Sequence, residues 1–326
     1  FARCGGGMSG SGIDHVGCHD GHIQGNYFES MSGNAIQTKG GSENIRIAAN
    51  TIIDGGERAL NIGGSTGFEF FRPPLSTTAP NFEASNIEAT ANRIVGSRAP
   101  FAFVGAVDSL AANNTIIDPT GWLVRILQET TSGGGYTFLA CANNTVTNNL
   151  FYFDRSALST HVNIGIGTDS SSFTFSNNLW FAHDDPQQSQ PGLPVTETDS
   201  VIGQDPLFVA PNSNDYHLLS ASPAIAAGLQ VAGVTEDFDG QPYNNPPSIG
   251  AFEGNPAALF ADVPPDHWAF FFIEKLASAG ITAGCGNNNY CPQAIVTRAQ
   301  MAVFLELVMN GANYDPPAAS GNVFFD

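Results

Sequence analysis

The chain has 326 residues and carries 11 Lys and Arg against 30 Asp and Glu, a formal net charge of −19 at pH 7. This acidic balance argues against a nucleic-acid partner, because binding to phosphate groups needs clustered cations. The longest apolar run, Trp268 to Ile273, is far shorter than a membrane span requires, and 36 glycines indicate a folded chain that is dense in turns.

A repeat runs through the first half of the chain. Segments 12–17, 35–40 and 59–64 align at offsets of 23 and 24 residues. Between them, an Asn precedes each apolar strand start, at Asn26, Asn50, Asn92, Asn114, Asn149 and Asn178. Asn suits such corners because it tolerates a left-handed φ and its amide can bond to the same Asn one coil further on. The spacing predicts a parallel β-helix; a β-sandwich, with strands every 8 to 12 residues, is the alternative.

The repeat register predicts a groove on one face. Ile13, Ile36, Leu60, Phe101 and Val162 are expected to point inward, so that their neighbours form an outward row. This row comprises Asp14, Gln37, Asn61, Ala102 and Asn163. Stacked polar side chains can hold an extended sugar chain, although a plain solvated face is the competing interpretation.

Charged residues are expected to reach the same groove. Two inserts, 65–85 and 130–142, interrupt the coil spacing and should project as loops from one side. With Lys39 and His19, the further candidates are Arg58, Arg72, Glu83, Arg125, Gln128, Glu129 and His161. Because the chain has so few cations, those gathered here suggest a site for a carboxylate or sulfate.

The end of the repeat resembles the closing segment of many secreted right-handed parallel β-helix proteins. The resemblance rests on 204–208, 215–218, 222–225, 237–240 and 249–253. It implies an all-β, pectate-lyase-like solenoid over residues 1–254, with N-terminal coils missing and a closing cap at about 200–254.

Residues 25–28, 39–45 and 50–51 resemble the β-helix polysaccharide lyases of the alginate lyase and chondroitinase B family. The resemblance implies that Lys39 abstracts the proton α to a uronate carboxylate, that an arginine assists the leaving oxygen, and that calcium neutralises the carboxylate. The family's arginine position aligns with Ile62, and Arg58 lies in the preceding corner. The candidate catalytic residues are therefore Lys39, Arg58, Arg125 and His161.

Other chemistry has weaker support in the sequence. Glycosidases of this shape use paired carboxylates, whereas Asp14, Asp20 and Asp108 form no adjacent pair. Of the segment that holds His15, Cys18, His19 and His22, only His19 is retained as a site candidate. Asp237 and Asp239 suit either a calcium site or an ordinary turn.

From Asn255 onward the chain resembles an S-layer homology (SLH) domain. Segments 260–263, 267–268, 280–282 and 296–300 carry the resemblance. Asp266 is expected to cap a helix that contains Phe270, Ile273, Leu276 and Ala277 and ends at Gly280. Thr297 is expected to cap a second helix with Met301, Phe304, Leu305 and Val308 on one face. Residues 255–326 are therefore assigned to this domain, with a further repeat starting at 323–326.

The SLH resemblance implies attachment to cell-wall polymers. It assigns Asp262, Trp268 and Arg298 to polymer binding, although Arg298 is equally explained as a surface charge at a helix start. Gln300 replaces the family's usual Glu.

Cysteine placement favours an extracellular location. Cys285 and Cys291 lie in a turn-rich loop where they can form a disulfide; free thiols or zinc ligands are the alternatives. Cys4 and Cys18 can close another loop, and Cys141 is expected to be buried.

These observations predict a secreted, cell-envelope-attached β-helix that binds acidic polysaccharide. Two classes of function stay open. One is a lyase that cleaves this polysaccharide by β-elimination, with calcium as its cofactor. The other is a non-catalytic adhesin or surface-layer component.

Overall fold

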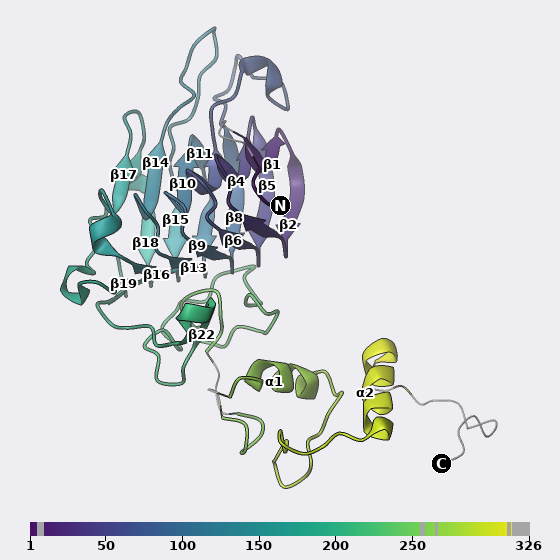
Figure 1. Ribbon diagram of the computed structural model, residues 1–326. Coiled ribbons are helices and arrows are strands. Elements are labelled where there is room, and N and C mark those ends of the chain that lie inside the picture. Colours follow the sequence, from purple (N-terminus) through teal and green to yellow (C-terminus); the bar gives the residue numbers. More distant parts are fainter. Residues whose placement is uncertain (5–9, 255–257, 265–266, 312–313, 315–326) are drawn as a thin grey trace. The chain divides into compact units, whose positions relative to one another are not determined.

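The computed structural model describes residues 1–4, 10–254, 258–264, 267–311 and 314. The chain divides into two compact units, Phe1–Gly254 and Asn255–Asp326. The first unit is a β-helix-like stack of parallel sheets, and the second contains two helices and long loops (Figure 1).

Three parallel sheets form the stacked part of the first unit. The groove sheet has the order β1 (Ser11–Val16), β4 (Asn34–Lys39), β7 (Arg58–Gly63), β10 (Phe101–Val104), β14 (Val124–Leu127) and β17 (Val162–Ile164). The second contains β2 (His19–Gln24), β5 (Ser42–Ala48), β8 (Ala84–Thr90), β12 (Leu110–Ala112), β15 (Thr145–Thr147) and β18 (Thr174–Ser176), with β11 (Ala106–Val107) on β8. The third contains β3 (Tyr27–Glu29), β6 (Thr51–Ile53), β9 (Arg93–Val95), β13 (Thr115–Ile117), β16 (Leu150–Phe153), β19 (Leu179–Ala182) and β20 (Val201–Ile202).

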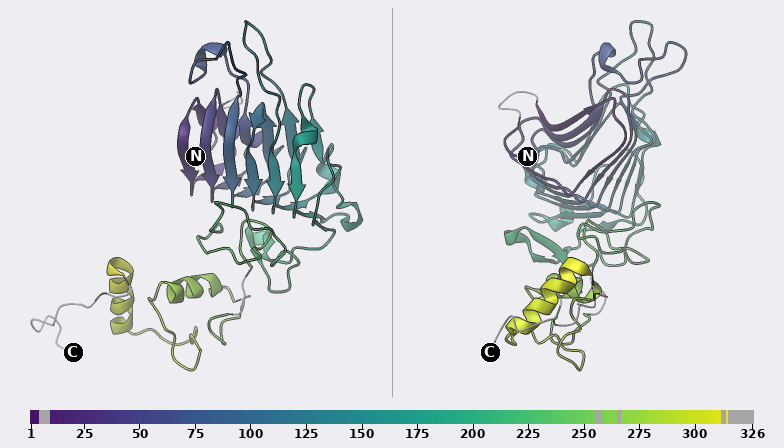
Figure 2. Two further views of the ribbon diagram at one scale, coloured as in Figure 1. Left: turned by 180° about the vertical axis from the view of Figure 1, so that it is seen from behind. Right: turned by 90° about the vertical axis from the view of Figure 1, so that its right-hand side faces the viewer.

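Each complete coil passes through all three sheets in turn, with two short strands, β11 and β12, in the second sheet of one coil, and successive coils pair in parallel (Figure 2). Apolar side chains from all three sheets fill the space between them, including Ile36, Leu60, Phe101 and Trp180. Phe151 and Trp180 stack on neighbouring coils with ring centroids 4.1 Å apart. Stacking therefore buries apolar faces that a single coil would leave exposed to water.

The predicted ladder of asparagines is confirmed. Along the stack, the side-chain amide of one ladder Asn donates to the side-chain oxygen of the next, over 2.8 to 3.1 Å. The donors are Asn26, Asn50, Asn92, Asn114 and Asn149. Asn178 ends the row and donates to Glu197 at 2.7 Å. Since every ladder Asn except the half-buried Asn26 is fully buried, these bonds satisfy amides that would otherwise be costly to desolvate.

The left-handed residue at each of these corners is the one before the ladder Asn. Ala49, Ala91 and Asn113 have φ of 51°, 52° and 54°. The ladder position and the turn position are therefore two adjacent residues with separate roles, not one Asn that does both.

The inserts project beyond the strands as expected (Figure 1). The first lies between β7 and β8 and contains the short helix η1 (Phe68–Phe70); the second lies between β14 and β15. They contact each other, because Phe68 packs against Tyr136 and Phe138 with ring centroids 5.5 and 5.8 Å apart. Asn81 adds backbone bonds to Thr137 and Leu139.

The closing segment covers the outer face of the third sheet. It contains the antiparallel hairpin β21 (Phe208–Ala210) and β22 (Asp215–Leu218). Phe208, Leu218 and Phe252 form a second core with Leu150 and Leu179, whose side chains point away from the first core. The expected cap at about 200–254 is thus a cover over a sheet face, because this face is apolar and needs burial.

Further short helices are η2 (Arg155–Ala157), η3 (Ser170–Ser172), η4 (Pro186–Gln188) and η5 (Pro211–Ser213).

The second unit contains α1 (Phe270–Ser278) and α2 (Arg298–Asn310). Phe260, Val263, Phe270 and Ile273 are central to its core. Asp266, the expected cap of the first helix, and residues 323–326, the expected start of a further repeat, lie outside the described residues. None of the helices in the described ranges has the length and apolar character needed for a bilayer crossing.

Thr297 caps α2 as predicted. Its hydroxyl accepts the Gln300 N–H at 3.2 Å, and Gln300 Oε1 accepts the Thr297 N–H at 2.9 Å. Gln300 therefore completes a capping box, so this helix start retains its reciprocal bonds without a Glu. The expected apolar face of α2 is present in sequence, but none of the helix's described residues is buried.

Candidate functional site

A groove of about 580 Å³ lies on the groove sheet. Of the predicted residues, it is lined by Gln37, Lys39, Arg58, Asn61, Arg125 and Glu129. Ser32, Gly33, Asn34, Glu57 and Ser65 complete the lining. Ser65 is the contribution of the first insert, so the described part of this insert leaves the groove open.

The parallel register aligns one row of residues along the groove sheet, and Gln37, Asn61 and Arg125 of this row line the groove. Asp14, Gln37, Asn61, Ala102, Arg125 and Asn163 are successive partners on neighbouring strands. This is the predicted row with Arg125 added to it. Parallel strands lie about 4.8 Å apart, so these side chains repeat at that interval along the stack.

The three groove cations have different partners. Lys39 Nζ lies 3.4 Å from Asp14 Oδ2. Arg58 pairs with the Glu129 carboxylate and also donates to Asn61 Oδ1 at 3.1 Å. Among the described residues, Arg125 has no carboxylate within ion-pair distance; its Nε donates to Asn163 Oδ1 at 3.0 Å.

Trp122 orients two arginines beside the groove. The guanidinium carbon of Arg125 lies 4.3 Å from the Trp122 ring centroid, and that of Arg98 lies 4.8 Å away. Arg98 in turn pairs with Glu57 at 2.9 Å. Burial lowers the pKa of Arg125, and the nearby Arg58 lowers it further. Sequence reasoning missed Trp122, whose position just before β14 lies outside the repeated residues.

Several predicted site residues lie outside the groove. Glu83 is 1% exposed, and its carboxylate accepts bonds from Gly40 N, Thr66 N and the Thr66 and Thr130 hydroxyls. It therefore ties both inserts to the end of the groove sheet. Gln128 closes the second insert, because it donates to Thr130 O and accepts from Cys141 N.

Arg72, His19 and His161 are also engaged elsewhere. Arg72 donates to the carbonyls of Glu69 and Phe71 within its own insert, and its carbonyl lies 3.0 Å from His19 Nε2. His161 is 9% exposed, and its Nδ1 accepts the Gly192 N–H. Burial lowers the pKa of His161 to about 4, with a further contribution from Arg155, so its ring is neutral at pH 7.

Asp237 and Asp239, the residues considered for calcium, lie in a hydrogen-bonded segment of the closing region. Asp237 accepts the backbone N–H groups of Asp239, Gln241 and Glu253, and the Asp239 carboxylate is hydrogen-bonded to His217. In the described ranges, no group of three or more His, Cys, Asp or Glu is arranged to hold a metal ion. Asp237 accepts the N–H groups of Asp239 and Gln241, as in a turn, and calcium stays a prediction.

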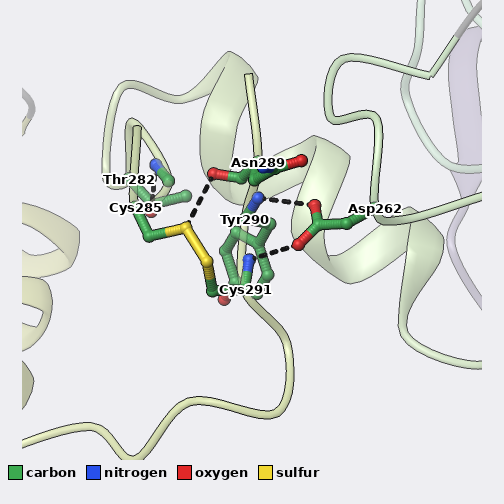
Figure 3. The surroundings of a disulfide bond; sticks show 7 residues. Asp262, Thr282, Cys285, Asn289, Tyr290 and Cys291 are labelled. Carbon is green, nitrogen blue, oxygen red and sulfur yellow. Dashed lines mark hydrogen bonds between the residues drawn. A yellow bond between two sulfur atoms is a disulfide. The ribbon is translucent and has the colours of Figure 1, made fainter. Parts of the chain in front are cut away.

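In the second unit, a disulfide between Cys285 and Cys291 closes a small loop (Figure 3). The Asp262 carboxylate accepts the N–H groups of Tyr290 at 2.7 Å and Cys291 at 2.8 Å. These bonds outweigh the effect of desolvation and lower the pKa of Asp262. Asp262 therefore fastens the disulfide loop in this structure. Cys4, Cys18 and Cys141 are free thiols.

The other two predicted polymer-binding residues are exposed. Trp268 is 82% exposed, and Arg298 is exposed at the start of α2. Residues 259–302 match the S-layer homology domain family. SLH domains bind cell-wall polymers, so this match gives the chain a module for attachment to the cell envelope. A comparison with curated proteins gave no match to the chain.

Proposed function

We propose that the protein is an extracellular, envelope-attached protein whose groove binds an acidic polysaccharide. The observation that carries this proposal is the convergence of Lys39, Arg58 and Arg125 on one open groove in a chain of net charge −19. Lys39 and Arg58 are paired with carboxylates, whereas Arg125 has no carboxylate of the described residues within ion-pair distance. This unpaired charge favours an anionic ligand, and the regular polar row suits an extended one. The SLH domain supports the attachment.

We also infer that residues 1–254 form a right-handed parallel β-helix. Its support is the order of the strands, since each coil leaves one sheet and returns to pair in parallel with the previous coil. About 98% of crossover connections between parallel strands of one sheet are right-handed, because that hand fits the twist of the strands.

The test of binding uses immobilised polygalacturonate, alginate and chondroitin sulfate, with neutral dextran as the control. We expect the full chain to bind at least one acidic glycan and not dextran. Binding to none of the acidic glycans would refute the proposal for the groove. Attachment is tested separately: Trp268→Ala should reduce co-sedimentation with purified cell walls and leave glycan binding unchanged.

A lyase reaction is the second candidate, because Lys39 lines the groove. Its amine would remove the proton α to the uronate carboxylate, and the resulting electron pair would form a carbon–carbon double bond as the glycosidic oxygen leaves. Lys39 would first have to leave its ion pair with Asp14.

Absorbance of unsaturated uronate, measured with and without Ca²⁺, tests cleavage. A rising signal that is lost in Lys39→Ala supports the lyase. A flat signal with retained glycan binding supports a non-catalytic adhesin or surface-layer role.

A further inference from the structure

Arg125 differs from the other groove cations in that no carboxylate of the described residues lies within ion-pair distance of it. Lys39 is paired with Asp14 and Arg58 with Glu129. The recorded hydrogen bond of Arg125 uses its Nε, and its acceptor is the neutral amide of Asn163. The two terminal nitrogens have no partner among the described residues, and the residue lines the groove.

The orientation of the Arg125 guanidinium is fixed by its surroundings. Stacking on Trp122 restrains the plane of the group, while the bond to Asn163 restrains its rotation within that plane. A guanidinium held in this way has lost its conformational freedom before the ligand arrives, which strengthens binding. Its terminal N–H groups form a fork that matches two oxygens of an oxyanion.

The surroundings of Arg125 oppose its positive charge on balance. Burial has the largest effect and lowers its pKa, Arg58 lowers it further, and Glu129 raises it, so an anion in contact with the guanidinium adds to the stabilisation of the charged form. Ala102, which precedes Arg125 in the row, has a small and fully buried side chain and therefore adds no competing polar group.

We propose that Arg125 is the anion-binding residue of the groove, that it holds an oxyanion of an acidic sugar through its terminal nitrogens, and that Trp122 and Asn163 are its positioning residues. The oxyanion is either a uronate carboxylate or a sulfate ester. This inference rests on the proposed glycan-binding function and adds the residue that recognises the charge.

The experiment measures the affinity of the full chain for polygalacturonate, highly methyl-esterified pectin and dextran sulfate. Esterified pectin keeps the sugar backbone of polygalacturonate but masks its carboxylates. Arg125→Gln should weaken binding of the preferred acidic glycan at least tenfold, consistent with the loss of a charge-assisted contact. Preference for polygalacturonate over pectin identifies a carboxylate, and preference for dextran sulfate identifies a sulfate.

Conservative variants separate positioning from charge. Arg125→Lys should also lose affinity, because lysine keeps the charge without the fork. Trp122→Leu should weaken binding severalfold at unchanged net charge, whereas Trp122→Phe, which retains an aromatic face, should largely restore it. Arg46→Gln, a cation loss on β5 in another sheet, is the matched control and should bind as the wild type does.

The outcomes keep the two proposals distinct. If the wild type binds no acidic glycan, the proposed function fails. If it binds one and Arg125→Gln binds equally well, Arg125 is not the anion-binding residue. Full affinity in Trp122→Leu, with an unchanged thermal unfolding midpoint, would overturn the positioning role.

Discussion

At the scale of single residues, buried polar side chains in the first unit have roles defined by their partners. Asn114 accepts the backbone and side-chain N–H groups of Asn92 and donates to Ala89 O, Ala112 O and Asn149 Oδ1. Removal of one such amide leaves several buried groups without partners. An unsatisfied buried group costs more than the net gain of one hydrogen bond.

We therefore predict that Asn114→Ala lowers the free energy of unfolding by about 2 to 4 kcal/mol, as measured by denaturant unfolding. The control is Asn44→Gly, which removes an exposed amide at a left-handed position. It should cost much less. Equal losses in the two variants would show that burial of the ladder is not what makes it stabilising.

His217 provides a pH-dependent contact in the closing segment. Burial alone would lower its pKa, but hydrogen bonds to Asp215 and Asp239 raise it to about 9. Because the unfolded value is about 6.5, the charged form stabilises the fold fully below pH 6.5, and this contribution is lost as the pH rises through 9.

We expect the unfolding free energy of the first unit to fall by on the order of 3 kcal/mol between pH 6.5 and 9. His217→Gln should flatten this dependence, whereas His22→Gln, at an exposed position on β2, should retain it. A pH profile unaffected by His217→Gln would contradict the assignment. Asp215, whose pKa is lowered by its contacts with His217 despite burial, affects stability only at acid pH.

At the scale of elements, the disulfide loop of the second unit is held by the covalent bond between its ends and by a carboxylate at its C-terminal end. Cys285 and Cys291 close a loop, and Asp262 binds the N–H groups of Tyr290 and Cys291. The covalent bond restricts the unfolded loop, and the carboxylate fixes its folded form. Loss of the disulfide should therefore be detected first at these two amides.

Cys285→Ser is predicted to destabilise the loop by about 2 kcal/mol, the value expected for a ring of this length. Hydrogen exchange at the Tyr290 and Cys291 amides should become faster, and reductant should have the same effect on the wild type. The first unit is an internal control, because the cysteines in its described residues are unpaired. Unchanged exchange at both amides would show that Asp262 alone holds the loop.

The periodic elements could be predicted from the sequence, and the contacts between loops could not. The ladder and the groove row recur at a fixed offset, so one coil predicts the next. Glu83 is different, because its burial depends on two inserts meeting around it. Trp122 lies in a connection without a periodic counterpart, and its role became evident only from the arginines stacked on it.

At the scale of the whole molecule, two strands of the third sheet carry a sequence signal for the closing segment. Residues 150–153 and 179–182 are runs of consecutive apolar or aromatic residues. Such runs are typical of strands buried on both faces. They indicate that the third sheet has a cover on its outer side, which the structure provides with Phe208, Leu218 and Phe252.

The net charge of −19 also affects encounters with an acidic glycan. Long-range repulsion acts over about 30 Å at 0.01 M salt and about 8 Å at 0.15 M, whereas the contact with Arg125 is local. We predict that the association rate with a polyuronate increases between these salt concentrations. Stopped-flow or biosensor kinetics measure it, and a steep decrease would indicate that the groove, not the net charge, controls encounter.

The asparagine ladder has a direction. Every ladder amide before Asn178 donates a hydrogen bond to the Asn of the next coil. The residue after the last Asn must therefore accept a hydrogen bond, but it has no further ladder residue to which it could donate one. A carboxylate meets that condition, and Glu197 also takes the Trp180 indole N–H at 2.7 Å. Glu197 therefore accepts the last hydrogen bond of the ladder. Deletion of the coil between Asn92 and Asn114 would shorten the stack by one coil, and the row of hydrogen bonds would still end at Glu197.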